Sequence, residues 1–377
     1  MTPPFDFESE GLLDGLEGEQ REARRELLEE LASDGVTLEE MKRAVAEDRL
    51  VFLPTERILA SGGRYTAAEV AELSGLDPVF QERQMRALGI ALGDPEDRAF
   101  DDEDVEAAKA VKLFLDAGIP EKGVLEVSRV LGDSMAKLAA AIGHAAREAL
   151  VRPGDTERDL GMRYLKATRE LVPFLGPLVA HALALHQRET AKNAVITQAD
   201  IAAGNLQGAE DICVCFADLV GFTRIGEDVD PVDLGRIANR LTDLAVEVTP
   251  PSVRLVKTIG DAVMLVSRRD VDPLLDTALA LVERSDEEGE QFPLLRVGVA
   301  YGEALTRSGD WYGRPVNLAS RITAHARPGT VLATNEVRDL ARDDYSWSLA
   351  GVRRFKGIRE PVGLVRVRRA SPADAQE

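Results

Sequence analysis

Three short stretches in the C-terminal half carry polar residues that a scaffold of strands and helices does not need. In FADLVGFTRIG, residues 216–226, an apolar run ends at Asp218 and a bend through Gly221 follows. A carboxylate at a strand end beside such a bend is suited to bind Mg²⁺ and to let backbone N–H groups approach a phosphate. The alternative is that Asp218 is an ordinary turn or capping residue.

The second stretch, VRLVKTIGDAVMLV, residues 253–266, reads as two strands joined by a tight polar turn. Antiparallel pairing with the strand that ends at Asp218 would bring Asp261 close to that carboxylate. Two adjacent carboxylates repel each other unless a divalent ion neutralises them. The alternative is a surface ion pair between Lys257 and Asp261, which would contribute well under about 1 kcal/mol.

The third stretch, GDWYGRPVNLASRITAHARPGT, residues 309–330, predicts a Gly-rich loop followed by a helix that begins near Pro315. Asn317 and Arg321 are four residues apart and therefore share one face of that helix. An amide and a guanidinium near a helix start suit an anion. Taken singly, they could also be a capping amide and a solvated arginine.

The elements that must position these residues differ between the two halves of the chain. From about residue 210 strands alternate with helices, which predicts an α+β domain with an antiparallel-rich sheet and a ferredoxin-like βαββαβ opening. The preceding part reads as an all-α domain of amphipathic helices, with a capping box from Thr37 to Glu40. We expect the helical domain over 1–204, including a final linker helix near 176–203, the α+β domain over 205–370, and a disordered tail over 371–377.

Bulk composition sets limits on function. The 377 residues carry a net charge of −20, which argues against a dominant nucleic-acid surface. The opening MTPPFDFESEG has no signal-peptide pattern, and the apolar stretch 171–185 is too short to span a bilayer. We therefore expect a soluble, cytoplasmic protein without a membrane span. Cys213 and Cys215 are expected to be buried strand thiols, because their spacing is poor for a disulfide.

The motifs FADLVGFT, KTIGD and DWYGRPVNLASR, in this order and spacing, resemble the catalytic domain of class III nucleotide cyclases over about residues 208–370. The resemblance implies that a nucleoside triphosphate is converted into a 3′,5′-cyclic nucleotide and pyrophosphate. It also implies two divalent ions per site, Mg²⁺ or Mn²⁺. Asp218 and Asp261 would be the metal carboxylates, and the backbone carbonyl of Leu219 would add a ligand.

The same resemblance implies roles for residues that contact the phosphates and the ribose. Asn317 would orient the ribose, and Arg321 would stabilise charge at the α-phosphate. The residues expected to contact the remaining phosphate oxygens are Gly221, Phe222 and Thr223 in the bend and Lys356 in RRFKGI.

Base choice follows from two further positions that the resemblance identifies, Lys257 and Asp310. Lys257 can donate to N1 of adenine and Asp310 can accept from its amino group, whereas guanine reverses both polarities. The resemblance therefore implies ATP as the substrate. Because the family builds its site between two catalytic domains and this chain carries both sets of residues, we expect a homodimer with two shared sites.

The N-terminal half carries a weaker signal. Residues 64–120 resemble the helix-turn-helix of merR-type regulators, but Asp77 and Glu82 accompany Arg83 and Arg86, which disfavours DNA. The whole arrangement resembles mycobacterial-type soluble cyclases with a helical N-terminal regulator, a subgroup that includes a pH-responsive enzyme. The alternative function is a non-catalytic sensor or DNA-binding regulator.

Candidate regulatory residues are the histidines of this half, because histidine titrates near neutral pH. They are His144, His181 and His186. Each could instead be an ordinary surface or core residue. The apolar run at 171–185 could contact a fatty acid or the dimer partner, so a proton and a fatty acid are both candidate regulators.

Overall fold

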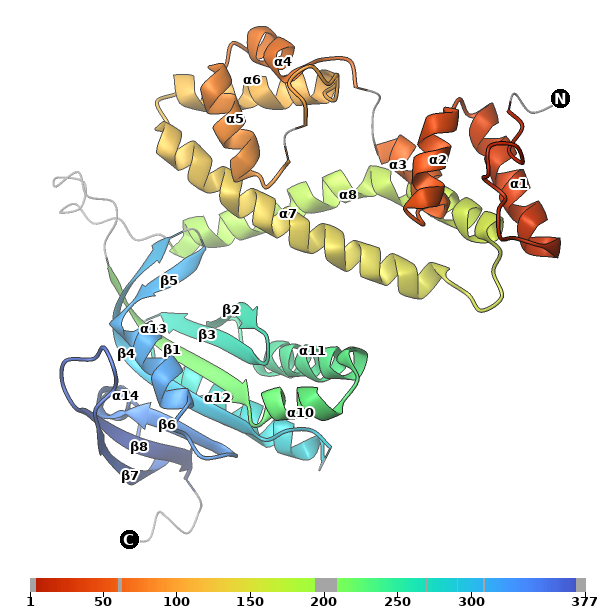
Figure 1. Cartoon of the computed structure of the whole chain (residues 1–377). Coiled ribbons are helices and arrows are strands. Elements are labelled where there is room, and N and C mark those ends of the chain that lie inside the picture. The colour runs from red at the N-terminus through yellow and green to blue at the C-terminus, as the bar shows by residue number, and fades with distance from the viewer. Residues whose placement is uncertain are drawn as a thin grey trace. The chain divides into compact units, whose positions relative to one another are not determined.

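The computed structural model describes residues 5–59, 63–91, 93–193, 209–268, 270–289, 291–307 and 309–370. The chain divides into two compact units, Met1–Val195 and Ile196–Glu377. We call them the helical unit and the α+β unit (Figure 1). The segment 194–204, where the linker helix was expected to end, and the expected tail at 371–377 lie outside the described residues.

The helical unit contains only helices among its named elements. They are α1 (Gly18–Ser33), α2 (Leu38–Ala46), the 3₁₀ turn η1 (Leu50–Phe52), α3 (Leu53–Leu59), α4 (Ala67–Ser74), α5 (Pro78–Ala87), α6 (Asp102–Asp116), α7 (Glu121–Leu150) and α8 (Glu157–Asn193). The capping box predicted at Thr37 is present, since its side chain accepts from the N–H of Glu40 and the Glu40 side chain accepts in return. No helix in the described ranges is long and apolar enough to cross a membrane.

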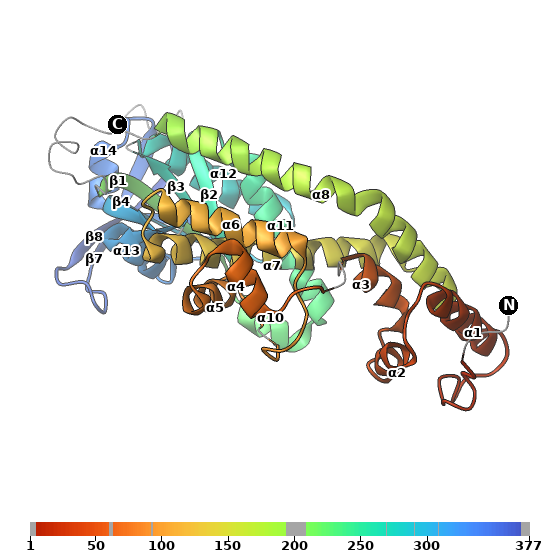
Figure 2. The same ribbon diagram turned by 90° about the horizontal axis from the view of Figure 1, so that it is seen from above.

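Helix α8 differs from the sequence expectation. The stretch 157–172 and the segment from 176 were read as separate helices, but they form one helix with Pro173 and Pro177 inside it (Figure 2). A proline inside a helix removes one hydrogen bond and strains the preceding turn, but it need not end the helix. Good helix formers on both sides, such as the ALAL run at 182–185, favour continuation.

Two separate apolar cores support the helical unit. One joins α1 and α2 through buried Leu27, Leu28 and Met41. The other joins α4, α5, α6 and α7 and includes Phe80 and Val105. The merR-like stretch is therefore a small helical module with its own core, held at its start by an isolated bridge between residues 65 and 100.

The α+β unit is built on one mixed sheet, which confirms the α+β fold. Its helices are α10 (Phe222–Asp228), α11 (Pro231–Val248), α12 (Asp272–Glu287), α13 (Arg314–Thr323) and α14 (Asn335–Leu340). Its strands are β1 (Glu210–Leu219), β2 (Val253–Ile259), β3 (Ala262–Arg268), β4 (Leu295–Arg307), β5 (Asp310–Gly313), β6 (Thr330–Thr334), β7 (Tyr345–Arg353) and β8 (Val362–Arg369).

The strand order is β2-β3-β1-β4-β6-β8-β7, and β5 pairs with the end of β4 (Figure 1). All pairs are antiparallel except β4 with β6. Two details differ from expectation. The Gly-rich loop before Pro315 contains the strand β5, and β7 ends at Arg353, so that FKGI forms a turn instead of continuing the strand.

The two faces of the sheet bury different helices. One face packs against α11, α12 and α14 and contains the free, fully buried Cys213 and Cys215, as predicted. The other face packs against α13, whose Leu318, Ala319 and Ile322 are buried. Because side chains alternate along β1, Asp218 points to the α13 face of the sheet, the face that also contains Phe216.

Candidate active site

The two carboxylates predicted to bind metal lie beside each other at the end of β1. Asp218 pairs in register with Ala262, the first residue of β3, and Asp261 precedes it. The backbone N–H of Leu219 donates to the carbonyl oxygen of Asp261 at 3.1 Å, which fixes the turn against the strand end. The sheet register therefore brings Asp218, Leu219 and Asp261 together.

The electrostatics of this corner suit a cation. The Asp218 side chain is only 17% exposed. Burial raises its pKa, the Arg296 guanidinium counteracts that rise, and the nearby Asp261 carboxylate adds to it. Arg296 donates from Nε to Asp218 at 2.7 Å. Two carboxylates and a backbone carbonyl at one corner are oxygen ligands of the kind that Mg²⁺ and Mn²⁺ prefer, so the residues fit a divalent ion.

Arg296 is a site residue that the sequence analysis missed. It lies on β4 directly opposite Asp218 and makes a second contact to the same carboxylate through Nη2. The available signal was a single charged residue inside the otherwise apolar strand PLLRVGVA. A guanidinium that is one-third exposed at this position can compensate the carboxylates or bind an anionic group of the substrate.

The predicted phosphate bend follows immediately. Gly221 adopts a left-handed φ of 76° and α10 begins at Phe222. Gly221 accepts from the N–H groups of Arg224 and Ile225, the first bonds of the helix. The N–H groups of Phe222 and Thr223 belong to the first turn, where a helix has no internal acceptors. The bend therefore has the backbone donors that a phosphate oxygen needs, three to five residues after Asp218.

The two residues expected to read the base are in contact. Lys257, beside a β-bulge in β2, forms an ion pair with Asp310 at the start of β5. Both side chains are about one-third exposed, and Asp310 also accepts from the N–H of Trp311 at 2.9 Å. Lys257 thus pairs with a residue 53 positions away in the sequence instead of with its neighbour Asp261.

Asn317 and Arg321 lie on the exposed face of α13. The opposite face is buried by Leu318 and Ile322, and Pro315 occupies the first turn. In the part of the chain that the structure describes, neither the Asn317 amide nor the Arg321 guanidinium has a hydrogen-bond or ion-pair partner in the same chain. Both polar groups are therefore available to a ligand.

The geometry separates Asn317 from the carboxylates of its own chain. Arg296, which is opposite Asp218, precedes Gly302 by six residues, or about 20 Å along a strand. The start of helix α13 lies against Gly302: if this glycine carried a side chain, its Cβ would be 3.7 Å from the Pro315 ring. Asn317 is about 3 Å further along the helix. It therefore lies roughly 17 Å along the strand from Asp218.

Lys356 lies at an exposed position of the turn Phe355–Ile358. This turn is beside Arg321: if Gly357 carried a side chain, its Cβ would be 3.8 Å from Arg321 Nη2. The three candidate regulatory histidines are elsewhere: His144 is on α7, and His181 and His186 are on α8. All three are exposed within the helical unit. The structure therefore brings Arg321 beside the turn that carries Lys356, while these histidines lie on other elements.

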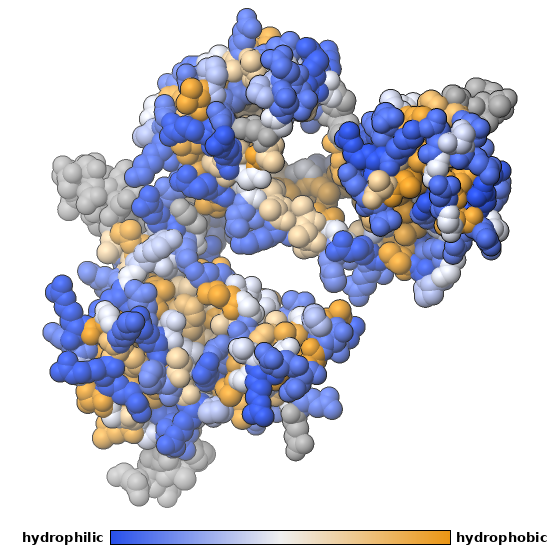
Figure 3. Space-filling view, in the orientation of Figure 1, coloured by the Kyte–Doolittle hydropathy of each residue, from blue (hydrophilic) through white to orange (hydrophobic). Residues whose placement is uncertain are grey.

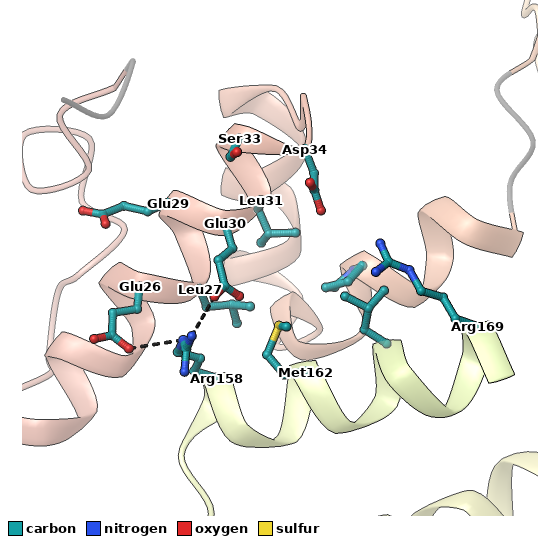
Figure 4. Close-up of a pocket in the computed structure, with 12 residues that line it drawn as sticks. Glu26, Leu27, Glu29, Glu30, Leu31, Ser33, Asp34, Arg158, Met162 and Arg169 are labelled. Atoms are coloured by element: carbon teal, nitrogen blue, oxygen red, sulfur yellow. Dashed lines mark hydrogen bonds and ion pairs between the residues drawn. The ribbon is translucent and has the colours of Figure 1, made fainter. Parts of the chain in front are cut away.

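The helical unit contains a cavity of about 620 Å³ between α1, α3 and α8 (Figure 4). Its floor is apolar, with Leu27, Leu31 and Met162. Its rim carries Arg158, which is held by Glu30 at 2.7 Å and Glu26 at 3.2 Å. None of the residues predicted for catalysis lines this cavity.

Comparison with known proteins gives the class to which this fold and site belong. Residues 205–363 match the family model of the adenylate and guanylate cyclase catalytic domain, and the chain is a class III nucleotide cyclase. Residues 5–191 match the adenylate cyclase regulatory domain.

The relatives narrow the class. The chain is 41% identical over 374 residues to a pH-sensitive adenylate cyclase of Mycobacterium tuberculosis, covering 97% of this chain and 93% of that protein. It is 33% identical over 292 residues to an adenylate cyclase of Streptomyces coelicolor, covering 76% and 74%. The chain therefore belongs to the class III adenylate cyclases with an N-terminal adenylate cyclase regulatory domain, and it is an enzyme of that family.

Among solved structures, the adenylyl cyclase CyaB from P. aeruginosa matches 44% of this chain and 97% of its own at 22% identity and a TM-score of 0.37. A rhodopsin-guanylyl cyclase core with converted specificity, in complex with ATPαS, matches 43% and 96% at a TM-score of 0.38.

Proposed function

We propose that the protein converts ATP into 3′,5′-cyclic AMP and pyrophosphate at sites shared between two copies of the chain. The estimate that supports this proposal is the separation of roughly 17 Å along the strand between Asn317 and Asp218 of one chain. The ribose and the α-phosphate are adjacent in ATP, so one molecule cannot contact both residues in the same chain. A second copy that supplies Asn317 and Arg321 completes the site.

The preference for adenine rests on the ion pair between Lys257 and Asp310. Each group holds the other in place, and both remain partly exposed. Lys257 has only donors and Asp310, when ionised, only acceptors. Adenine offers an acceptor at N1 and a donor at its amino group, so it can bind to both. Guanine presents the opposite polarity and would leave both groups unpaired, which is costly in a desolvated site.

Asp218 and Asp261 would hold two divalent ions, Mg²⁺ or Mn²⁺, which when bound supply the positive charge that activates the ribose 3′-oxygen and screens the triphosphate. The support for this donor set is the mutual proximity of the two carboxylates, whose repulsion a bound cation relieves. The Leu219 carbonyl is the third oxygen of the set. Arg296 compensates Asp218 before substrate arrives.

The remaining residues bind and orient ATP. Asn317 would hydrogen-bond the ribose, and Arg321 would stabilise the negative charge that grows on the α-phosphate oxygens during in-line attack. The N–H groups of the bend at Gly221, Phe222 and Thr223 would donate to phosphate oxygens. Lys356 would bind the terminal phosphates, which leave as pyrophosphate.

We further propose that the helical unit regulates the reaction, with a proton or a fatty acid as the signal. The proton is favoured because the relative at 41% identity is a pH-sensitive cyclase. The exposed His144, His181 and His186 have no particular environment that marks one of them as the sensor. The apolar floor of the cavity in Figure 4 could bind the chain of a fatty acid, whereas the carboxylates on its rim would repel the carboxylate of the fatty acid.

Helix faces in this unit are also open to a partner. Exposed apolar side chains follow α7 and α8, and Figure 3 shows apolar surface along the middle of α7. Leu171, Phe174 and Leu178 on α8 are each more than 60% exposed. A dimer partner or a fatty acid at this face would link the regulatory state to the catalytic dimer. A cytoplasmic location stays a prediction from the sequence.

DNA binding is the weaker alternative for the merR-like module. The two arginines on α5, its second helix, are already paired with carboxylates: Arg83 with Glu121 at 3.1 Å and Arg86 with Glu82 at 2.5 Å. Phosphate affinity needs free basic groups that release counterions. The measurement that would revive this alternative is a salt-dependent shift of labelled duplex DNA by the full chain.

The test is a turnover assay of the full chain with ATP or GTP and Mn²⁺, repeated over a dilution series. We expect cyclic AMP, little cyclic GMP, and specific activity that falls as the dimer dissociates. Equal rates with both nucleotides would refute the base-reading pair. Specific activity that stays constant well below the dimer dissociation constant would refute the shared site. Mixing inactive Asp261→Asn and inactive Arg321→Ala chains should restore activity, because one of the two sites in the mixed dimer is intact.

A further inference from the structure

A histidine outside the predicted catalytic residues links two of the cationic groups of the site. His325 lies one turn after Arg321, at the end of α13. Its ring packs edge-on against Phe355, with ring centroids 5.1 Å apart and an interplanar angle of 89°. Such an edge-to-face pair is attractive beyond the area that it buries. Phe355 directly precedes Lys356.

The same ring caps the helix that carries Arg321. Regular α-helical bonding would direct the backbone N–H of His325 to the carbonyl of Arg321, but this N–H donates to Ile322 instead, at 2.9 Å. The imidazole Nδ1 takes its place, 2.9 Å from the Arg321 carbonyl oxygen. A carbonyl can only accept, so Nδ1 carries the proton and donates. This bond satisfies a carbonyl at the helix end and fixes the ring toward Phe355.

The segment that carries Lys356 is a tight turn anchored at both ends. Ile358 donates from its N–H to the Phe355 carbonyl at 3.1 Å, and Gly357 has a φ of 83° at the third position. These features define a type II turn with Lys356 at its second position. Phe355 is buried in the same core cluster as Ile322 of α13, and Ile358 packs against that cluster. The turn therefore rests on the end of α13.

We propose that His325 is a positioning residue, which holds the Lys356 turn against the end of α13 so that Lys356 and Arg321 act as one anion-binding unit. The inference rests on the proposed role of Lys356 at the terminal phosphates. The contact of the ring with Phe355 carries the inference, and the bond from Nδ1 to the Arg321 carbonyl orients the ring for that contact. Neither contact touches the substrate, so His325 acts only through the two cations.

The two contacts can be removed separately. In His325→Asn the amide nitrogen can still donate to the Arg321 carbonyl, but the ring that holds Phe355 is gone. In His325→Phe the ring remains and the donor is lost. We expect His325→Asn to raise the KM for ATP about threefold to tenfold with kcat nearly unchanged, because an aromatic pair is lost and ground-state phosphate binding weakens. We expect His325→Phe to keep the KM within about twofold of the wild type.

A double-mutant cycle with Lys356→Met decides whether His325 works through the lysine. Lys356→Met should raise the KM more than His325→Asn does. Adding His325→Asn to Lys356→Met should then change the KM by less than about twofold, because the positioned group is already absent. Phe355→Leu keeps an apolar anchor without the ring and should reproduce the effect of His325→Asn. Leu349→Ser, at a side chain that is 84% exposed on β7, is the matched control and should leave the KM unchanged.

The outcomes separate this inference from the proposed function. If Lys356→Met raises the KM and His325→Asn does not, the positioning role of His325 is wrong and the role of Lys356 stands. If Lys356→Met leaves the KM unchanged, the assignment of Lys356 is wrong and the inference is lost with it. If the effects of His325→Asn and Lys356→Met simply multiply, His325 does not act through Lys356. Thermal midpoints of all variants within about 2 °C of the wild type exclude a loss of folding as the cause.

Discussion

Some charges of the proposed site in the α+β unit differ from the ion pairs that join helices in the helical unit. In the helical unit several ion pairs join elements far apart in sequence, as Arg24 does with Glu157 through two hydrogen bonds of 2.6 and 2.5 Å. In the α+β unit Asp218 has a like-charged neighbour, Asp261, as well as its partner Arg296. Arg321 has no partner in the described part of the chain, whereas Lys257 and Asp310 are paired with each other.

This difference distinguishes charges that stabilise the fold from charges kept for a ligand. A buried charge paired within the helical unit supports the fold, because removal of its partner would leave it uncompensated. A buried carboxylate whose pKa is raised by burial and by a second carboxylate opposes folding at neutral pH, which is typical of a group that serves binding or catalysis. Substitutions in the two units should therefore have opposite effects on activity and stability.

The largest effect is expected for Asp261→Asn. The substitution removes a proposed metal ligand, so turnover should fall on the order of a thousandfold, since metal-ion stabilisation is worth several kcal/mol. It also removes the repulsion against Asp218, so the thermal midpoint of the α+β unit should not decrease. Cyclic AMP formation and a thermal melt followed by tryptophan fluorescence check both parts, because both tryptophans, Trp311 and Trp347, lie in this unit.

The matched control is Asp343→Asn, which makes the same chemical change at an exposed position of the α+β unit. It should alter neither turnover nor the midpoint. A clear drop of the midpoint in Asp261→Asn would contradict the comparison, because it would show that Asp261 stabilises the fold like the paired charges of the helical unit.

The next effect is expected for Lys257→Glu. The new carboxylate would face Asp310 and repel it, and the donor to adenine N1 would be lost. Turnover of ATP should fall about a hundredfold, less than in a fully buried site because both side chains are about one-third exposed. Arg254→Glu reverses the same charge on the same strand at an exposed position and should change turnover less than about twofold. Similar losses in both variants would mean that overall charge, not base reading, controls the rate.

Much of the catalytic site could be predicted because the polar residues stand out against apolar strands. Asp218 ends a buried run and Asp261 follows a short strand, so antiparallel pairing alone brings them close. The pairing of Lys257 with Asp310 is different, since it depends on a β-bulge and on a hairpin that was read as a loop. Its members came from the family resemblance, and no local pattern predicts their contact.

Other features could not be predicted because they depend on the register of distant elements. Arg296 is one residue in an apolar strand, and only the register of β4 against β1 places it opposite Asp218. The contact of His325 with Phe355 likewise joins a helix end to a turn 30 positions later. In α8 two stretches were read as separate helices, but they form one helix that continues through Pro173 and Pro177.

The third effect tests the helical unit. Arg24→Met removes one partner of a pair in which both side chains are at least two-thirds buried and leaves Glu157 without its two donors. We expect a loss of about 2 kcal/mol in the free energy of unfolding of this unit. The far-UV circular dichroism transition, dominated by helices, should move to lower temperature, while the tryptophan fluorescence transition of the α+β unit stays in place.

Its control lies on the next residue. Arg25→Met breaks an exposed i,i+3 pair with Glu22 at 3.6 Å and should shift neither transition measurably. Equal shifts of the circular dichroism midpoint in Arg24→Met and Arg25→Met would show that the buried pair does not stabilise the helical unit. A fluorescence transition that moves together with the helical one would show that the effect is not confined to this unit.

The smallest effect concerns the loop between α7 and α8, where Asp155 accepts two bonds from Arg163, at 2.6 and 2.8 Å, and one from the N–H of Arg152 at 2.8 Å. These donors lower the pKa of Asp155 to about 2, with the Arg163 bond as the main cause. A lowered pKa of Asp155 stabilises the folded chain at pH values above the unfolded pKa near 4, and this stabilisation is lost as the pH falls toward 2.

Asp155→Asn should therefore lower the midpoint of the helical transition at pH 7 by less than Arg24→Met does. The difference in midpoint between this variant and the wild type should disappear between about pH 4 and pH 2. A difference in midpoint that stays constant over that range would mean that the variant loses packing or geometry and not a charge interaction. The control is Asp133→Asn, which makes the same change at a surface carboxylate in an exposed pair with Lys137.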